Sequence, residues 1–548
     1  MNRLIWRIAC SAFAALAFLF AADTSAQAAG MVRKAPAPAW AVALAVPQPS
    51  PARRDQVSGG IYYLLVDHQV RPGEPADVDY RRMAFQVTDR EGLEEAGKID
   101  IDFDPGSDDV TLHHIRLIRN GAILDRIGDV TIRTLQREED LEQGVFTGRK
   151  QLHLELKDIR VGDVVDYAFS RTTHSAVLAS QIFTSQSLTW SAPAGLTYYR
   201  LLWPHGVPIT LKRFAGAPAP QVTHSRDRDI YEWRMADATP VAGESDAPGW
   251  APQWAEVSVS NMTSWGEVVA WALPIYNRPD RLPADWAAAV DRIAQETADP
   301  ALRITRALRL VQDRVRYVSL SIGAGSFQPR APAEVVRSGY GDCKDKALLL
   351  TLSLRRLGID ASPALTDADA GRGLPDQPPS ANAFDHVIVR IKVAGRSHWV
   401  DPTRSQEGGV FPNLAPVRTA WALPIAPGQA ALEAIPMGAQ PSPSQEVVER
   451  YEWPRGEASP LTLAVTTIYR GEDADWMRAK LAADSPADTD KNYLKYYAKM
   501  YPGLRRGLAD AGQSRRKRRN GQRGLFASRR GAQARRTGRQ VPDHSLSA

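Results

Sequence analysis

Cysteine is nearly absent from this 548-residue chain, which contains only Cys10 and Cys343. Cys10 lies within an N-terminal segment that reads as a removable export signal, so the mature chain is expected to keep Cys343 alone. A single thiol excludes an internal disulfide, and an unpaired cysteine in an exported protein is a candidate reactive group. The scarcity of cysteine therefore directs attention to the surroundings of Cys343.

Long apolar runs are lacking as well. The apolar residues 8–20 follow Arg3 and Arg7 and precede an Ala-Gln-Ala cleavage pattern at 26–28, an order typical of a secretory signal peptide. A run of about 13 residues is too short to span a bilayer comfortably, and no later segment is long and apolar enough to do so. We expect residues 1–28 to be a signal peptide and the mature protein to be soluble, periplasmic or secreted, without stable membrane insertion.

Positive charge is concentrated at one end of the chain. The formal net charge is +6, but residues 504–548 hold twelve Arg and one Lys against two Asp, so the preceding residues carry a net charge of −5. We therefore predict no nucleic-acid binding by the folded part. Residues 504–548 have almost no apolar periodicity and are predicted to be a disordered basic tail. The tail either contacts anionic polymers or is a frameshifted or truncated end. The abrupt loss of strand-like sequence favours the second interpretation.

Composition and local patterns divide the chain into several regions. The hydrophobic content of 44% and the charged content of 24% are ordinary for globular proteins. Residues 29–56 are rich in Pro and Ala and read as a linker. Residues 57–245 show β-type alternation and hairpin punctuation, which predicts an all-β sandwich domain, taken as antiparallel and of unknown function. Residues 445–503 read as a partial C-terminal β region.

Residues 260–435 change to a helical period. Ser264 and Glu267 match a capping box, and residues 285–297 and 300–317 continue with helical apolar spacing. A further helix is expected to begin at Cys343 with Asp342 as its N-cap. A polar loop and two strands follow, which predicts an α+β domain.

The cysteine helix and the two strands carry the parts of a nucleophilic site. A thiol attacks only as the thiolate, and a helix N-terminus stabilises negative charge. Lys344 and Lys346 favour the thiolate, whereas the neighbouring acidic residues oppose it. His386 follows Cys343 by 43 residues and Asp401 follows His386 by 15, so His386 is the candidate base and Asp401 the group that orients it.

Each member of this set also has an ordinary structural interpretation. A buried cysteine is often an inert small hydrophobe, a lone histidine is often structural, and an Asp before Pro402 is common in turns. His398 is a competing base, but alternation along a strand would send it to the face opposite Asp401. The combined order and spacing favour Cys343, His386 and Asp401 as a catalytic triad.

Metal sites are not predicted. An acidic group at residues 100–109 suggests calcium, but Gly106 is misplaced for a calcium loop and Thr111 occupies the position of the closing Glu. His113, His114 and His398 lack the spacing of metal ligands.

Three segments carry a resemblance to a known family. Residues 340–347 (YGDCKDKA), 384–387 (FDHV) and 399–403 (WVDPT) resemble the core motifs of the bacterial transglutaminase-like superfamily. Residues 156–163 (LKDIRVGD) lie in a β-rich region similar to an uncharacterised module that often precedes such domains in exported bacterial proteins. Together the resemblances cover about residues 60–435.

The resemblance implies a papain-like α+β core at 260–435 and acyl transfer through a thioester on Cys343. The acyl group would come from a peptide or protein amide, the acceptor would be an amine or water, and no metal or organic cofactor is required. The backbone N–H of Cys343 and the side chain of Gln328 are the candidate oxyanion donors. The alternative function is a non-catalytic secreted binding or scaffold protein that keeps the papain-like fold.

Overall fold

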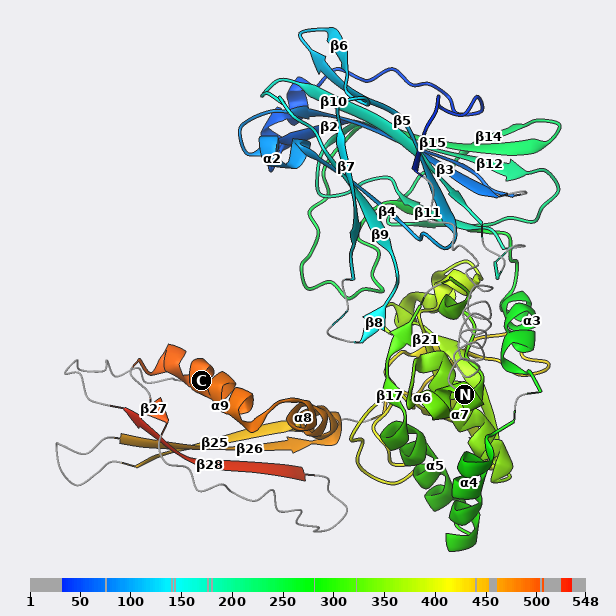
Figure 1. The fold of residues 1–548 in the computed structure, drawn as a ribbon, viewed down its shortest axis with the longest axis vertical. Coiled ribbons are helices and arrows are strands. Elements are labelled where there is room, and N and C mark those ends of the chain that lie inside the picture. Colours follow the sequence, from blue (N-terminus) through cyan, green and yellow to red (C-terminus); the bar gives the residue numbers. More distant parts are fainter. Residues whose placement is uncertain are drawn as a thin grey trace, which may run out of the picture.

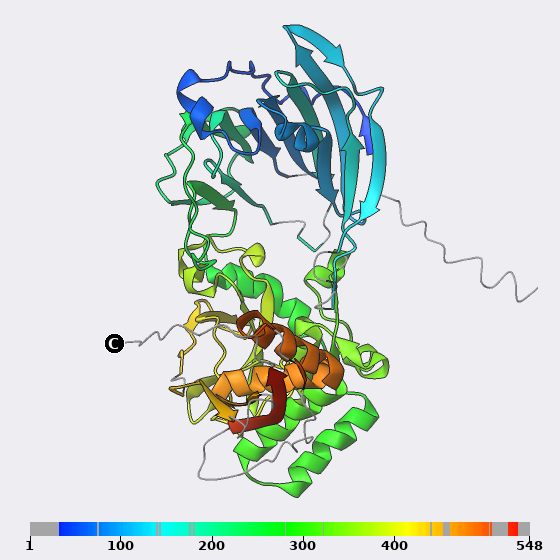
Figure 2. The same ribbon diagram turned by 90° about the vertical axis from the view of Figure 1, so that its left-hand side faces the viewer.

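The computed structural model describes residues 32–502, apart from 74–75, 139–140, 142–143, 175–176, 179–180, 280, 322, 439–440 and 453–460, together with the strands at 505–506 and 524–534. The expected signal peptide lies outside the described residues. Figures 1 and 2 show a strand-rich N-terminal part at one end of the molecule and a helical central part at the other. No helix in the described part of the chain combines the length and the apolar character needed to cross a membrane.

A nine-stranded sheet forms the centre of the N-terminal part. Its strands follow the order β1-β5-β10-β3-β2-β12-β15-β14, and β6 pairs with β5. Neighbouring strands are antiparallel except for β1–β5 and β2–β12, which are parallel. The strands are β1 (Val32–Lys34), β2 (Ile61–Arg71), β3 (Asp77–Val87), β5 (Asp108–Arg119), β6 (Ala122–Asp125), β10 (Val164–Thr173), β12 (Ala194–Pro204), β14 (Gln221–His224) and β15 (Arg228–Ala238).

Two three-stranded sheets pack against the large sheet. The first is β4 (Lys98–Phe103), β9 (Lys150–Glu155) and β7 (Thr131–Gln136), and the second is β11 (Phe183–Ser187), β16 (Glu256–Ser260) and β13 (Thr210–Phe214). In β4 the side chains of Ile99, Ile101 and Phe103 alternate with exposed residues and join the core shared with the large sheet.

The N-terminal part therefore differs from the expected sandwich of antiparallel strands. It contains three sheets, two parallel strand pairs and a short helix, α2 (Gly92–Ala96). It also extends beyond residue 245, because β16 pairs with both β11 and β13. Local alternation could predict the strands, but not which of them pair.

The segment expected to be a linker is bound to the large sheet. The side chain of Gln69 pairs with the backbone N–H and carbonyl of Val42, and Arg82 donates to the carbonyl of Leu44 at 2.7 Å. The segment also contains β1 and a 3-10 turn, η1 (Pro51–Gln56). A Pro- and Ala-rich sequence lacks a helical or strand period, yet its backbone groups can still be bound by side chains from elsewhere.

The central part packs five helices against a five-stranded antiparallel sheet. The sheet has the order β22-β21-β20-β23-β24. The helices are α3 (Trp265–Tyr276), α4 (Ala284–Glu296), α5 (Pro300–Arg314), α6 (Pro332–Ser338) and α7 (Cys343–Arg356). The strands are β20 (Asp360–Thr366), β21 (His386–Val393), β22 (Arg396–Val400), β23 (Trp421–Pro424) and β24 (Glu433–Ala434).

Helix α7 lies in the middle of this part. Leu349, Leu350 and Leu354 are fully buried in one core with Val389 and Ile391 of β21. Short elements border the helix: β17 (Arg316–Tyr317), β18 (Ser319–Leu320), η3 (Gly323–Ser326), β19 (Tyr340–Gly341), η4 (Gly371–Asp376) and η5 (Ala381–Ala383). Ser264 caps α3 as predicted, but α5 ends at Arg314, so the helix expected to reach residue 317 gives way to β17.

The C-terminal part is a four-stranded sheet with two helices. Strands β25 (Gln445–Glu452), β26 (Leu461–Arg470), β28 (Gly524–Ala534) and β27 (Arg505–Arg506) are neighbours in that order. Helices α8 (Gly471–Ala483) and α9 (Pro486–Met500) lie between β26 and β27 in the chain. The region expected to be a tail thus supplies both β27 and β28, which pair with each other, and β28 also pairs with β26. The other residues of that tail lie outside the described residues.

Candidate active site

Cys343 is the first residue of α7. The side chain of Asp342 accepts the backbone N–H of Asp345 at 3.0 Å, and the Asp345 side chain accepts that of Asp342 at 3.3 Å. This reciprocal capping box fixes the first turn of the helix. Cys343 is only 6% exposed, and its thiol lies where the helix N-terminus stabilises negative charge.

Cations pair with both acidic residues that flank the thiol. Lys344 Nζ lies 2.7 Å from a carboxylate oxygen of Asp342. Arg330 binds Asp345 through its backbone N–H at 2.7 Å and its guanidinium at 2.8 Å. Burial lowers the pKa of Lys344, but the negative charges of Cys343 and Asp342 raise it above its ordinary value. Lys344 therefore remains charged and offsets the acidic residues beside the thiol.

The first residue of β21 and the residue after β22 bring the other two predicted groups together. His386 Nε2 lies 3.1 Å from Asp401 Oδ2, and both side chains are largely buried. The second carboxylate oxygen of Asp401 accepts the backbone N–H of Thr403 at 2.9 Å and its hydroxyl at 2.6 Å. These bonds fix the carboxylate, which in turn orients the imidazole ring.

Electrostatics favour the charged form of both members of this pair. Burial lowers the pKa of His386, but the charge of Asp401 and the hydrogen bonds with Asp401 and Cys343 raise it to about 11. Burial raises the pKa of Asp401, but the imidazolium of His386 holds it well below its usual range. Because Nε2 faces Asp401, Nδ1 is the ring nitrogen left to exchange a proton with the Cys343 thiol.

The role of Gln328 as an oxyanion donor stays a prediction. Its side chain is exposed, whereas the next residue, Pro329, is buried and Arg330 is bound to Asp345. His398 does not compete as a base, since its ring packs on Phe411 at 4.9 Å between ring centres.

Two tyrosines beside the thiol were not recognised in the sequence. Burial and then the negative charge of Cys343 raise the pKa of both Tyr276 and Tyr317. Both phenols therefore stay protonated, and Tyr317 is also close enough to sense the charge of Asp401. The helical spacing of residues 300–317 predicts a helix that includes Tyr317, and this prediction gives no indication of the direction of its side chain. The alternation of apolar Val315 with charged Arg316 is the strand-like signal that the sequence contains.

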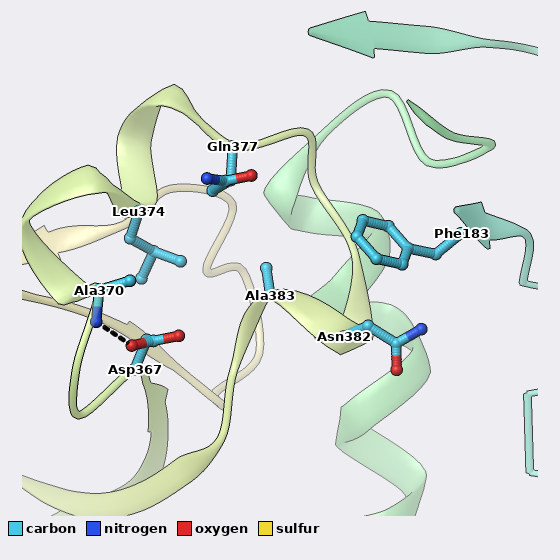
Figure 3. A pocket seen from close by; sticks show the side chains of 7 residues that line it. All are labelled: Phe183, Asp367, Ala370, Leu374, Gln377, Asn382 and Ala383. Carbon is cyan, nitrogen blue, oxygen red and sulfur yellow. Dashed lines mark hydrogen bonds between the residues drawn. The ribbon is translucent and has the colours of Figure 1, made fainter. Parts of the chain in front are cut away.

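A cavity of about 110 Å³ lies near the start of β21. Figure 3 shows Phe183 of β11 approaching it opposite the loop that carries Asp367 and Leu374. None of Cys343, His386 and Asp401 lines this cavity. Its lining residues are Phe183, Asp367, Ala370, Leu374, Gln377, Asn382 and Ala383. The cavity therefore marks a contact region between the N-terminal and central parts.

A metal site would need several His, Cys, Asp or Glu side chains close together in the part of the chain that the structure describes. There, no group of three or more His, Cys, Asp or Glu side chains is arranged to hold a metal ion.

Comparison with known proteins gives one family match. The family DUF3857, a domain of unknown function with a solved structure, matches residues 77–242. This match covers most of the nine-stranded sheet and does not extend to Cys343. No curated protein matches the chain.

A solved structure resembles the chain over a much greater length. A crystal structure described as a "putative protease from Parabacteroides distasonis" covers 88% of this chain and 94% of its own, with a TM-score of 0.56 and 11% identity. A TGase covers 39% of this chain and 55% of its own (TM-score 0.16, 11% identity). The periplasmic domain of TgpA from Pseudomonas aeruginosa covers 53% and 87% (TM-score 0.18, 16% identity).

The last two likenesses are too loose to support an argument. The first extends over nearly the whole of both chains. At its low identity it shows the fold alone, so the chain shares its overall fold with that Parabacteroides distasonis protein.

Proposed function

We propose that this chain is an exported transglutaminase-like cysteine enzyme that transfers or hydrolyses acyl groups of peptide or protein amides through a thioester on Cys343. The observation that carries the proposal is the buried His386–Asp401 pair, which lies against a thiol at the N-terminus of α7. The three motifs at Cys343, His386 and Asp401, with the overall fold, support the same conclusion.

The proposed reaction begins with a proton held by His386. The imidazolium and the thiolate form an ion pair, and the sulfur attacks the amide carbonyl carbon of the substrate to form a tetrahedral oxyanion. His386 then donates its proton to the departing nitrogen as the C–N bond breaks, which leaves a thioester on Cys343 and a free amine or ammonia. An incoming amine or water gives its proton to His386 and attacks the thioester, and departure of the sulfur restores the starting ion pair.

The oxyanion needs hydrogen-bond donors. The backbone N–H of Cys343 is one candidate, since the first N–H groups of a helix have no partner within the helix. The side chain of Gln328 and the protonated phenol of Tyr317 are the other candidates. Asp401 holds the imidazole in place and stabilises its positive charge throughout. These roles use residues of the chain alone.

Thiol labelling tests the proposal directly. The purified protein, with Cys10 changed to Ser, is treated with iodoacetamide between about pH 4 and 9, beside the same protein carrying His386→Ala. We expect fast labelling of Cys343 below pH 7 that collapses in the variant, because the imidazolium stabilises the thiolate.

Labelling that rises only near about pH 8.5, the ordinary value for a thiol, and that ignores His386→Ala would contradict the enzyme proposal. That outcome would favour the alternative of a secreted binding or scaffold protein. Val393→Ala is a control at the opposite end of β21, where the side chain is only partly buried.

A further inference from the structure

The N-terminal part reaches the candidate active site through one hairpin. Strands β7 and β9 extend from the first small sheet, and between them lies β8 (Val145–Phe146). We call the described residues 131–138, 141 and 144–155 the arm. Glu138, which follows β7, binds the residues that follow β8. Its carboxylate accepts the backbone N–H groups of Thr147 at 2.7 Å and Gly148 at 3.0 Å. Thr147 and Gly148, which follow β8, are therefore bound to the end of the strand that precedes it.

The tip of the arm pairs with a strand of the central part. Ser319 donates its backbone N–H to the carbonyl of Gly144 at 2.8 Å, and Ser321 donates to that of Phe146 at 2.8 Å. Figure 1 shows β8 where the strand-rich part meets the helical part. Because these N–H groups are already bound, a substrate cannot use them to pair with β18. The arm takes the position that another chain would need.

This contact lies near the start of α7, because Tyr317 of β17 pairs with Gly341, two residues before Cys343. Tyr317, which senses the charge of Cys343, is separated from Ser319 by one residue. Gly144 passes so close to β17 that an added Cβ atom would lie 3.3 Å from the carbonyl oxygen of Tyr317. Gly144 also has a positive φ of 76°, which favours glycine. A side chain at Gly144 would therefore push the arm away from Tyr317.

The N-terminal part also touches the loop on the other side of the triad. The hydroxyl of Ser260 donates to the carbonyl of Pro379 at 2.6 Å, and Phe183 lines the cavity beside Asn382. This loop leads into His386. The N-terminal part therefore contacts the chain next to Tyr317 and also the chain that leads to the base, while Cys343 itself is only 6% exposed.

From this arrangement we infer that the arm is one wall of the entrance to Cys343 and selects flexible, extended polypeptide segments over the surfaces of folded proteins. The inference rests on the proposed function and adds a substrate class to it. A folded surface would have to approach across both the arm and the loop before His386. An extended segment needs an opening only as wide as a single polypeptide chain to reach Cys343.

The experiment uses a maleimide carried on two supports, a flexible peptide and a folded domain of similar mass that lacks cysteine. The full chain with Cys10→Ser is labelled at Cys343 with each maleimide reagent, and the rate with the flexible peptide is divided by the rate with the folded domain. The same ratio is measured for the Gly144→Val variant. The ratio cancels any change in thiol reactivity. We expect a strong preference for the flexible support, and a preference about tenfold weaker in Gly144→Val, since displacement of the arm costs two backbone hydrogen bonds.

Two further variants sharpen the result. Gly121→Val is the matched control, because Gly121 also has a positive φ, of 82°, but an added Cβ would contact nothing within 4 Å. It should leave the ratio unchanged. Ser321→Pro removes one of the two hydrogen bonds from the opposite strand and should weaken the preference even if Gly144→Val does not fold.

An unchanged ratio in folded Gly144→Val and Ser321→Pro proteins would overturn the inference, as would an equal rise in both rates. Either result would leave the effect of His386→Ala on iodoacetamide labelling intact. The experiments therefore distinguish an error in the role of the arm from an error in the proposed chemistry of Cys343.

Discussion

Asp401 is the residue on which the candidate site depends most. Its two carboxylate oxygens are occupied by His386 and Thr403, and the side chain is 12% exposed. Water can replace these partners only in part. Removal of the carboxylate charge would therefore leave a buried imidazolium without its counter-ion, which is costly in a protein interior.

We predict that Asp401→Asn lowers the free energy of unfolding by about 3 kcal/mol near pH 5–6, the usual cost of breaking a buried ion pair. The raised pKa of His386, about 11, gives stability that is complete below the unfolded value of about 6.5 and is lost as the pH rises toward 11. The lowered pKa of Asp401 gives stability that is complete above about 3.9 and is lost as the pH falls. The difference between wild type and variant should therefore be largest between about pH 4 and 6.5.

Urea unfolding of both proteins across this range measures that difference. Asp291→Asn is the matched control, because Asp291 pairs with Arg356 at 2.7 Å on the surface, where both side chains are nearly half exposed. Its effect should stay below about 1 kcal/mol. A difference for Asp401→Asn that does not change with pH would contradict the assignment of the charges.

At the scale of elements, the loop between β20 and β21 determines where His386 lies. Gly371 begins η4 in this loop, and an added Cβ atom would lie 1.9 Å from the carbonyl oxygen of Thr419. Two backbone segments are therefore in contact at a point where only glycine is small enough. The contact fixes the loop about fifteen residues before the base.

We predict that Gly371→Ala destabilises the protein by about 2–3 kcal/mol, because one backbone segment must move. We also expect it to slow labelling of Cys343 below pH 7, since movement of the loop would displace His386. Gly358→Ala is the comparison: Gly358 ends α7 with a φ of 76°, but an added Cβ would contact nothing within 4 Å. It should cost about 1 kcal/mol, the penalty of the backbone conformation alone. Equal losses for the two variants would show that the contact with Thr419 is unimportant.

Local signals in the sequence predict the features of the fold that depend on one residue and its near neighbours, such as the start of a helix. Asp342 and Ser264 cap their helices because their side chains satisfy nearby N–H groups, an interaction within a few residues. The pairing of β2 with β12 and of β8 with β18 joins residues more than a hundred positions apart and has no local period. The bound segment at 32–56 and the position of Tyr317 were missed for the same reason. The motifs indicated Cys343, His386 and Asp401, but they could not indicate the arm beside them.

At the scale of the whole molecule, the buried apolar side chains of the described residues fall into separate clusters. The largest cluster spans residues 262–425 and contains Leu350, whereas a second, within residues 61–165, contains Leu154. The described contacts between the two parts include the β8–β18 pair and single hydrogen bonds such as Ser260 to Pro379. Such interfaces do not by themselves enforce cooperative unfolding.

We therefore predict at least two transitions when the protein is unfolded by heat and followed by calorimetry, since each cluster can melt with its own part. Leu350→Ala and Leu154→Ala provide a matched pair, because both side chains are fully buried and each substitution should cost about 2–5 kcal/mol. Leu350→Ala should lower only the transition at which labelling of Cys343 loses its dependence on His386, and Leu154→Ala only the other. A single transition lowered by both variants would mean that the arm and the loop before His386 join the two parts into one cooperative unit. In that case the arm would stabilise the fold around Cys343 in addition to bordering its entrance.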